Sequence, residues 1–290
     1  MERRFEPIIA KLLTCDSAKD ILNAYHNGLR SVKTSFDLQL STTECLIKDG
    51  YVLINGDELK IDDLEEIKDD ERSIYLLQNN SLSIVEIRAE HYYKLVRTER
   101  GHAPTLEIDG IHMHRIFGTF PEKDAEAKVR LVGSLKNKLV IDTCMGLGYT
   151  AISAIKMKAK QVITVERDEN VYGLARINPW SWALKNDKVV TVISDVAEFV
   201  SKLDDNSFDV IIHDPPRISL AGELYSSDFY HELCRILKPS GRIVHYVGSP
   251  GKHSAKRIHI GVMNRMRAAG FRVYWDEITE CVYGYKAAVT

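Results

Sequence analysis

The strongest constraint on the fold is the alternation of apolar and helical segments in the second half of the chain. From about Lys136, stretches with helical spacing separate five apolar runs: KLVID, KQVITVE, KVVTVIS, FDVIIHD and GRIVHYV. Continuous apolar strands that alternate with helices are typical of a mostly parallel sheet covered on both faces. The last two runs of the chain, FRVYWDEI and ECVYGYKAAV, are close enough together to form an antiparallel hairpin. The sequence therefore predicts a doubly wound, mostly parallel α/β sheet with a terminal antiparallel hairpin.

The earlier part of the chain has shorter segments with good turn sequences between them. VKTSFDLQL alternates apolar and polar residues, as a half-buried strand does. Asp49-Gly50 and Asn79-Asn80 are typical of two-residue hairpin turns. We therefore expect a small β-rich domain over residues 1–110 and the α/β domain over residues 111–290.

Two short helices and one acidic stretch are also expected in the N-terminal domain. FEPIIAKLL and SAKDILNAYHNG both have helical spacing, and the second is predicted to be capped by Asp16 or Ser17 and to end at Gly28. The acidic stretch GDELKIDDLEEIKDDER is interpreted as a solvated face, with an acidic docking surface as the alternative.

Charge and cysteine usage exclude several classes of protein. The formal net charge is −2, so no global basic field favours nucleic acid, and no DNA partner is expected. The five cysteines form no C-x-x-C pair, which fits free thiols in a reducing cytosol. We expect no signal peptide and no membrane span, which places the protein in the cytoplasm without a membrane partner. The oligomeric state is left open, and a homo-oligomer is one alternative.

An acidic residue follows each of the first four predicted strands of the α/β domain: Asp142, Glu166, Asp195 and Asp214. In doubly wound sheets, ligands bind beyond the carboxyl ends of the strands, where the strand order reverses. A single acid in such a position often caps the following helix. Four in succession at one edge favour a ligand site, and capping alone is the alternative.

The stretch VIDTCMGLGYTAISA indicates which cofactor such a site holds. Gly146 and Gly148 let the backbone approach a ligand, and Gly146 to Ala151 fits the dinucleotide pattern G-x-G-x-x-A. A pyrophosphate would be repelled by Asp142, whereas S-adenosylmethionine carries a cationic amine and sulfonium. Glu166 has the spacing of an acid that accepts ribose hydroxyls. We assign Asp195 to the adenine amino group and Tyr149 to the methionine end, with a packing ring as the alternative for Tyr149.

These residues, together with Asp214-Pro215-Pro216, resemble the successive motifs of class I S-adenosylmethionine-dependent methyltransferases from about Lys136 to Thr290. The whole chain resembles a group of predicted archaeal methyltransferases, including LEIDGIHMHRI and the region from Asp214 to Ile243. The resemblance implies a Rossmann-like methyltransferase domain that binds S-adenosyl-L-methionine through Asp142, Gly146, Gly148, Tyr149, Glu166 and Asp195. Cys144 replaces the first glycine of the usual loop, and we interpret it as a packing residue.

The second half also resembles spermidine synthases, which share the fold and transfer an aminopropyl group from decarboxylated S-adenosylmethionine. SDVAEFV, FDVIIHD and ELYSSDFYHELCRILKPSG follow their order. Asp142 stands where those enzymes have glycine, and Arg217 stands where they have a second acid. A cation there disfavours a polyamine and suits an anionic group, although Arg217 can instead form an ion pair with Asp214 or Glu223.

The acceptor side of the predicted reaction rests on the loop after the fourth strand. Asp214 is predicted to orient the attacking nitrogen and accept its proton, and Pro215 fixes the backbone beside it. Arg217, Tyr225 and His114 are the predicted substrate contacts. The functional prediction is an N-directed methyltransferase, with aminopropyl transfer as the alternative and a non-catalytic cofactor- or RNA-binding protein as a further one. The acceptor class, whether small molecule, RNA or protein, is left open.

Three other features have alternative interpretations. His112 and His114 lie on one face of an extended segment, where interdomain packing, substrate contact and a metal pair are alternatives, and no metal site is predicted. Trp180 and Trp182 are expected in the core, with a ring near the adenine as the alternative. The basic helix over residues 252–267 is expected to be a solvated face, and the alternative is an RNA surface that includes Lys252, Lys256, Arg257, Arg265 and Arg267.

Overall fold

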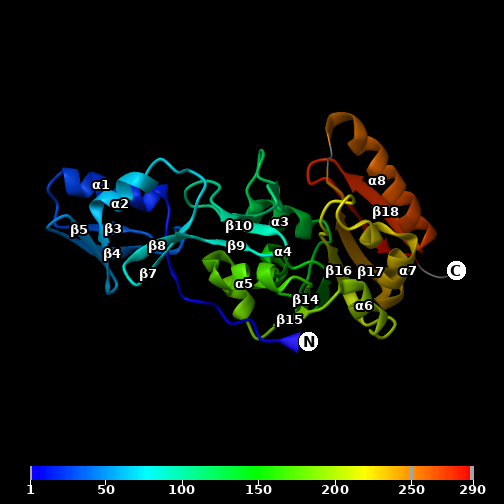
Figure 1. Cartoon of the computed structure of the whole chain (residues 1–290). Helices are drawn as coiled ribbons and strands as arrows, with labels where there is room; N and C mark the ends of the chain where they lie inside the picture. The colour runs from blue at the N-terminus through cyan, green and yellow to red at the C-terminus, as the bar shows by residue number, and fades with distance from the viewer. Residues whose placement is uncertain (1, 249–250, 288–290) are drawn as a thin grey trace. The chain divides into compact units, whose positions relative to one another are not determined.

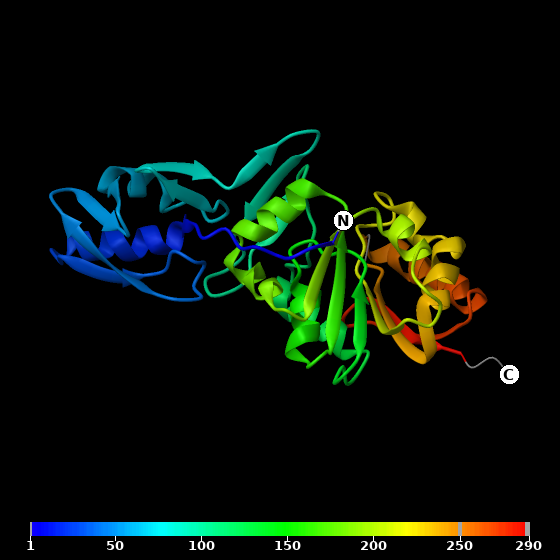
Figure 2. The same cartoon turned by 90° about the horizontal axis from the view of Figure 1, so that it is seen from below.

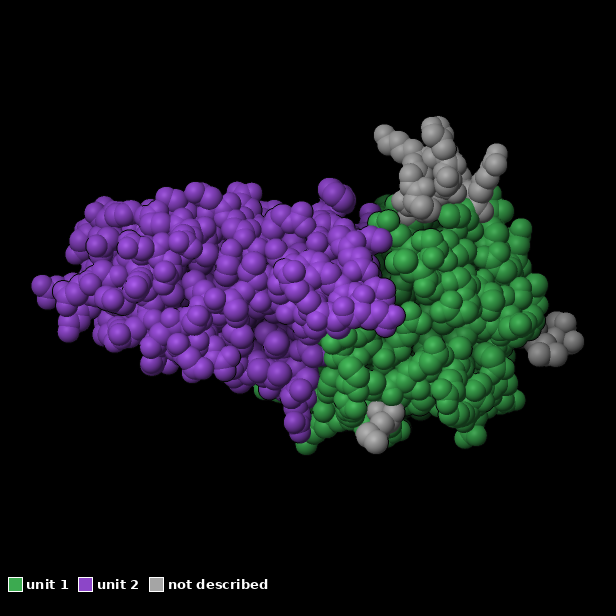
Figure 3. Space-filling model, viewed as in Figure 1, with its two compact units in different colours: residues 1–5, 122–172, 183–290 green, residues 6–121, 173–182 purple. Residues whose placement is uncertain are grey.

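The structure is a computed structural model that describes residues 2–248 and 251–287, with side chains omitted for residues 251–257. Figure 3 shows its two compact units. The sheet unit comprises residues 1–5, 122–172 and 183–290, and the N-terminal unit comprises residues 6–121 and 173–182. The predicted domain boundary after residue 110 stays a prediction. In the structure, the long segment of the N-terminal unit ends at residue 121.

The sheet unit contains an eight-stranded sheet in the order β1-β15-β14-β13-β16-β17-β19-β18 (Figure 1). Its strands are β1 (Glu2–Arg3), β13 (Leu139–Asp142), β14 (Gln161–Glu166), β15 (Val189–Ile193), β16 (Phe208–His213), β17 (Leu237–Tyr246), β18 (Phe271–Asp276) and β19 (Cys281–Lys286). The five central strands pair in parallel, and β18 and β19 form an antiparallel hairpin on β17. The predicted fold class is confirmed.

One strand of this sheet was not predicted. The short strand β1 pairs antiparallel with the edge strand β15, with Glu2 opposite Val192 and Arg3 opposite Thr191. Arg3 also donates to Glu169 at 2.8 Å from within the same unit. Two residues carry too little hydrophobic pattern to indicate a strand from sequence.

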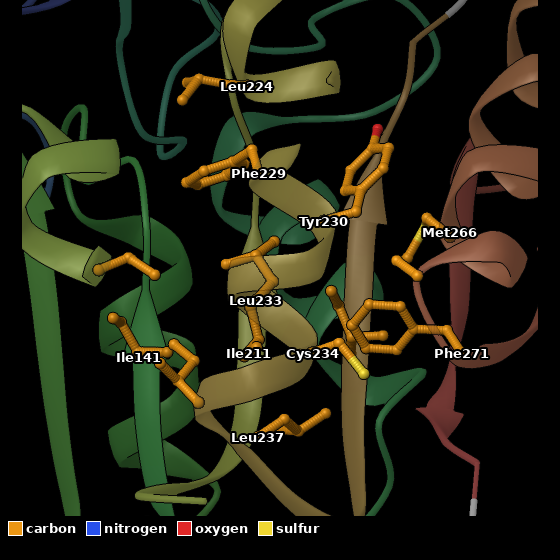
Figure 4. Packing of buried hydrophobic residues seen from close by; sticks show 14 of the residues in the cluster. Ile141, Ile211, Leu224, Phe229, Tyr230, Leu233, Cys234, Leu237, Met266 and Phe271 are labelled. Carbon is orange, nitrogen blue, oxygen red and sulfur yellow. The ribbon is translucent and has the colours of Figure 1, made fainter. Parts of the chain in front are cut away.

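One helix precedes the first parallel strand, and the others follow the strands as the apolar spacing predicts. They are α3 (Pro121–Arg130), α4 (Tyr149–Lys156), α5 (Glu169–Ile177), α6 (Val196–Ser201), α7 (Ser227–Ile236) and α8 (Gly251–Ala268), with 3-10 turns η1 (Pro179–Lys185) and η2 (Gly222–Tyr225). Helix α7 begins after Ser226, whose hydroxyl accepts from Phe229 N–H at 3.1 Å. Figure 4 shows its Leu233 beside Ile211 of β16, and these residues belong to one buried cluster with Tyr230 of α7 and Met266 of α8.

The N-terminal unit contains small antiparallel sheets and the helices α1 and α2, together with the end of α5 and the start of η1. Its sheets have the orders β3-β4-β5-β6, β2-β7-β8 and β12-β11-β10-β9. The strands are β2 (Lys11–Leu13), β3 (Ser31–Thr34), β4 (Thr43–Lys48), β5 (Tyr51–Ile54), β6 (Asp57–Lys60), β7 (Tyr75–Gln78), β8 (Ser81–Ile84), β9 (Glu86–Arg88), β10 (Tyr92–Val96), β11 (Thr105–Ile108) and β12 (Ile111–His112). Figure 2 shows helix α1 (Cys15–His26) beside the strands of the first sheet, and its apolar face shares a buried core with α2 (Ile61–Ile67).

Both predicted hairpins in this unit are present. Strands β4 and β5 pair across Asp49-Gly50, with φ of 49° and 82°, and strands β7 and β8 pair across Asn79-Asn80, with φ of 52° and 62°. Left-handed values at both turn residues match the right-handed twist of the flanking strands. The acidic stretch forms β6 and α2, and α2 buries Ile61, Leu64 and Ile67. Its acidic residues lie at positions between these buried ones.

Three local predictions for the N-terminal unit were wrong. FEPIIAKLL contains no helix, because Pro7 disfavours helical backbone at Glu6, and its last three residues form β2. Helix α1 is capped by Thr14 instead of Asp16 or Ser17, and the Ser17 hydroxyl accepts from Thr14 N–H at 3.0 Å. The strand predicted over VKTSFDLQL ends at Thr34.

Candidate functional site

The parallel sheet reverses its strand order between β13 and β16. Strand β13 has β14 on one side and β16 on the other, and Asp142 lies opposite Ile212 of β16. Thr143, the first residue after β13, donates its N–H to the Ile212 carbonyl at 3.0 Å. The loops that follow β13 and β16 therefore leave from neighbouring strands at the same edge, which is where doubly wound sheets bind ligands.

The loop after β13 depends on its two glycines. Gly146 and Gly148 have φ of 53° and 79°, which glycine adopts at little cost. A Cβ atom on Gly148 would lie 2.4 Å from a methyl carbon of Leu184, whereas one on Gly146 would meet nothing within 4 Å. Gly148 is therefore required for close packing, while Gly146 leaves its surroundings open.

Glu166, at the end of β14, holds this loop. Its Oε2 accepts from Gly146 N–H at 2.9 Å, and its Oε1 accepts from Arg167 N–H and Asp168 N–H at 2.9 and 3.0 Å. Burial raises the pKa of the Glu166 carboxyl to about 6, against the opposing effect of these hydrogen bonds. The predicted ribose-binding acid is thus next to the predicted glycine loop, with its charge partly compensated by backbone donors.

Asp142 is fully buried beneath the loop. Thr164 and Thr150 donate their hydroxyls to its two oxygens at 2.6 and 3.1 Å. Burial raises the pKa of Asp142 to about 7. The side chain ties β13 to β14 and α4 from inside the sheet unit, and its assignment to donor binding stays a prediction. Tyr149 is also buried, with 4% of its surface exposed.

Asp195 begins helix α6. Its Oδ1 accepts from Ala197 N–H and Glu198 N–H at 2.9 and 3.0 Å, and the residue is exposed. Capping is therefore one function of this acid, as the alternative interpretation holds. Capping uses one carboxylate oxygen, so the predicted contact with an adenine amino group is still compatible with the geometry.

Asp214, which directly follows β16, lies in an ion cluster that the sequence did not predict. Lys128 of α3 donates from Nζ to the two Asp214 oxygens at 3.1 and 2.9 Å. The same ammonium lies 2.8 Å from Asp124 and 3.6 Å from the ring centroid of Tyr246. We call these four residues the acceptor cluster. Two carboxylates and an aromatic face around one ammonium form a well-compensated buried cation site.

The ionisation of this cluster follows from burial and from its opposite charges. The Lys128 side chain is 6% exposed, Asp124 5% and Asp214 22%. Burial disfavours the ammonium, but Asp214 and Asp124 outweigh it and raise the pKa of Lys128. Burial raises the pKa of Asp214, and Lys128 opposes that shift. Lys128 is therefore the cation of the cluster, and Asp214 is the most exposed of its three charged members.

Three of the remaining predicted acceptor residues follow Asp214 in the chain, in the loop and in η2. Pro215 is buried and Arg217 is exposed. Asp214 pairs with Lys128 instead of Arg217, and Glu223 lies 3.7 Å from Arg167. Tyr225 is buried, and its hydroxyl donates to the Pro216 carbonyl at 2.9 Å. The Tyr225 hydroxyl thus fixes the backbone of the loop at Pro216.

Two buried histidines also support this loop. His213 and His245 occupy paired positions on β16 and β17, with ring centroids 4.3 Å apart. His213 Nε2 lies 3.0 Å from the Leu224 carbonyl, an acceptor, so this nitrogen carries the proton. Its Nδ1 then accepts from the Thr143 hydroxyl at 2.7 Å. Burial lowers the pKa of His213 to about 4, so this ring is neutral at neutral pH.

Other predicted residues belong to the N-terminal unit. His114 Nδ1 lies 3.1 Å from Thr105 Oγ1, and His112 Nε2 lies 3.7 Å from Glu107. Trp180 donates from its indole nitrogen to the Leu38 carbonyl at 3.0 Å. Among the side chains that the structure describes, those of residues 2–248 and 258–287, no group of three potential metal-binding residues is present. The substrate role of His114 stays a prediction.

The basic helix α8 is only partly described. Arg265 donates to the Tyr225 carbonyl at 2.8 Å, and Arg267 contacts Asn264 at 3.3 Å. The side chains of Lys252, Lys256 and Arg257 lie outside the described residues. Arg265 therefore supports η2 from within the sheet unit. Among the described helices, none is long and apolar enough to cross a bilayer.

Comparison with known proteins defines the family. The chain is 41% identical over 269 residues to Uncharacterized protein MJ1233 of Methanocaldococcus jannaschii, covering 89% of each chain. The protein therefore belongs to the same family as MJ1233. Residues 123–258 match the family model described as Conserved hypothetical protein 95.

More distant relatives carry a named activity. The chain is 28% identical over 200 residues to the polyamine aminopropyltransferase of Mycobacterium tuberculosis, which is 66% of this chain and 37% of that protein. It is 34% identical over 132 residues to the polyamine aminopropyltransferase of Prochlorococcus marinus, or 42% of this chain and 44% of that protein. The chain thus spans less than half the length of these enzymes.

Several solved structures of spermidine synthases share this fold. A spermidine synthase in complex with the transition state analogue AdoDATO superposes with a TM-score of 0.59 and 21% identity, covering 72% of this chain and 78% of that one. The spermidine synthase of Thermotoga maritima has a TM-score of 0.54 and 20% identity, covering 72% and 76%. The chain therefore has a Rossmann-like, spermidine synthase-like fold.

Sequence reasoning missed the acceptor cluster and the histidine pair. Asp124 and Lys128 are four residues apart on a helix before the predicted α/β pattern, where a charged pair most often indicates a solvated face. The histidine pair had a detectable signal, since FDVIIHD and GRIVHYV each place a histidine near the end of an apolar run. Only the strand order makes these two positions neighbours.

Proposed function

We propose that the protein is a spermidine synthase-type aminopropyltransferase that uses decarboxylated S-adenosylmethionine and an amine acceptor. The observation that carries this proposal is the acceptor cluster, in which Asp124, Asp214 and the Tyr246 ring surround an ammonium. The cluster lies at the carboxyl end of β16, beside the point where the strand order reverses. The named activity of the aminopropyltransferase relatives supports the same donor class.

The other strand ends fit the adenosyl part of such a donor. Glu166 is suited to accept from ribose hydroxyls, and the exposed Asp195 carboxylate is suited to an adenine amino group. A bound adenosyl sulfonium supplies a carbon activated for nucleophilic attack. The carboxylates at this edge favour its positive charge, and they would repel a pyrophosphate.

Asp214 is the proposed catalytic residue. Its partly exposed carboxylate can orient an acceptor nitrogen and accept the proton that this nitrogen loses. A nitrogen–carbon bond forms as the carbon–sulfur bond breaks, and the sulfur retains the electron pair of the broken bond as a neutral thioether. Lys128 fixes the Asp214 carboxylate, so the acceptor is aligned without reorganisation of the loop.

Methyl transfer from intact S-adenosylmethionine is the second candidate. The specific observation in its favour is the positive charge on the acceptor loop, where Lys128 contacts Asp214 and the exposed Arg217 follows three residues later. Both cations disfavour a polyamine in that loop. The donor residues are the same for both reactions, so the two candidates differ in the group transferred and in the acceptor.

The deciding experiment compares transfer from labelled decarboxylated and intact S-adenosylmethionine to a panel of amines. Product formed only with the decarboxylated donor supports our proposal, and product formed only with the intact donor replaces it with methyl transfer. The Asp214→Asn variant is expected to lose at least about a hundredfold in turnover while its donor affinity, measured by calorimetry, stays within about twofold. Failure of wild-type protein to bind either donor would reject both transfer reactions.

A further inference from the structure

We propose that Lys128 determines acceptor specificity, so that the enzyme accepts an amine with one positive charge and discriminates against polyamines. This inference rests on the proposed function and specifies the substrate class of the same site. It follows from the position of the Lys128 ammonium between Asp124 and Asp214. Without Lys128, both carboxylates would be available to bind ammonium groups of the acceptor.

The geometry makes Lys128 a permanent occupant of the acceptor cluster. Its Nζ lies 2.8 Å from Asp124 and 2.9 Å from Asp214, and the Tyr246 ring covers it at 3.6 Å. Only 6% of the Lys128 side chain is exposed. An ammonium with two carboxylate partners in such a place is costly to displace, because displacement breaks both ion pairs in a largely buried environment.

Charge counting then limits the acceptor. Asp124 and Asp214 contribute two negative charges and Lys128 one positive charge, so the acceptor cluster carries a net charge of −1. One further ammonium at the exposed side of Asp214 neutralises it. A second ammonium on the same acceptor finds no remaining carboxylate in the cluster and lies on a loop that also presents Arg217.

The test varies this charge in steps. Lys128→Met changes the net charge of the acceptor cluster to −2, and Asp124→Asn changes it to 0. The double variant, Asp124→Asn with Lys128→Met, restores a net charge of −1. Lys123→Met is the matched control, because Lys123 is an exposed lysine on the same helix. Calorimetry measures the binding of butylamine and of 1,4-diaminobutane to each protein saturated with 5′-methylthioadenosine, and transfer to both amines is assayed in parallel.

We expect wild-type protein and Lys123→Met to bind butylamine more tightly than 1,4-diaminobutane. Lys128→Met should shift the ratio of the two affinities toward the diamine by at least about tenfold. Asp124→Asn should weaken butylamine binding at least about tenfold, and the double variant should recover it. An unchanged affinity ratio in Lys128→Met, or a wild-type preference for the diamine, overturns the proposal.

The design also separates this inference from the proposed function and from folding. Absence of aminopropyl transfer by wild-type protein would reject the proposed function, whereas the binding ratios test Lys128 without turnover. Lys128→Met leaves two carboxylates close together and is the variant most at risk of unfolding. If Lys128→Met does not fold, the test is the butylamine affinity of Asp124→Asn compared with that of the double variant. Equal affinities in those two proteins would reject the role of Lys128.

Discussion

The Thr143 hydroxyl donates to His213 Nδ1 at 2.7 Å and thereby joins the glycine loop to the end of the strand that Asp214 follows. Thr143 directly follows β13, and His213 is the last residue of β16. This one hydrogen bond connects the two loops that the proposed function assigns to donor and acceptor. Its loss should therefore affect both stability and the alignment of the substrates.

Thr143→Val removes that hydrogen bond and leaves a buried acceptor on His213 without its donor. The free energy of unfolding is expected to fall by about 1–2 kcal/mol, measured by urea denaturation. Turnover should fall more than donor affinity, because the loops are displaced relative to each other. Thr143→Ser, which retains the hydroxyl, should recover most of the turnover, and failure to do so would show that the methyl group matters instead.

The buried His213 predicts a loss of stability at acid pH. Its pKa is lowered from 6.5 to about 4, so the unfolded chain takes up a proton between these values and the folded protein does not. The stabilisation is present above pH 6.5 and is lost as the pH falls toward 4, by about 3 kcal/mol. Denaturant titrations from pH 8 to 4 should show a shallower decline for His213→Gln than for wild type. Parallel curves for the two proteins would exclude His213 as the source.

Alanine substitutions at the two loop glycines should differ in cost. Gly148→Ala places a methyl group 2.4 Å from Leu184 at a φ of 79°, and we expect a loss of at least about 3 kcal/mol. Gly146→Ala meets no atom within 4 Å and should cost about 1–2 kcal/mol, from its positive φ alone. Thermal unfolding of both variants measures the difference. Equal losses would contradict the packing argument.

Tyr225→Phe tests whether the Asp214 loop is held by the Tyr225 hydroxyl. Loss of the 2.9 Å bond to the Pro216 carbonyl should lower kcat/KM for the acceptor about tenfold while donor affinity stays unchanged. Tyr274→Phe is the matched control, because Tyr274 is 47% exposed on the terminal hairpin. An equal effect of the two substitutions would argue against a positioning role for Tyr225.

The sequence predicts the sheet well because its signals are local and repeated. Apolar runs such as that of β16 and hairpin turns such as Asp49-Gly50 depend on adjacent residues, and both were located correctly. The proximity of the glycine loop and Glu166 could be predicted from the strand order that is typical of doubly wound sheets. Their contact, from Gly146 N–H to Glu166 Oε2, is what that order implies.

The acceptor cluster could not be predicted in the same way. Lys128 and Asp214 are 86 residues apart in sequence, and no local pattern relates them. The helix that carries Lys128 precedes the first strand of the recognisable pattern. The burial of Asp142 also depends on Thr164 and Thr150, whose hydroxyls occupy the oxygens that sequence reasoning assigned to a ligand.

The pairing of β1 with β15 has a consequence for any attempt to isolate the sheet unit. Glu2 and Arg3 cover one side of β15, although residues 6–121 of the intervening chain belong to the other unit. A protein that starts at residue 122 would keep all five parallel strands but would expose the outer N–H and C=O groups of β15. An uncovered strand of this kind recruits further chains, so the shortened protein would tend to self-associate through β15.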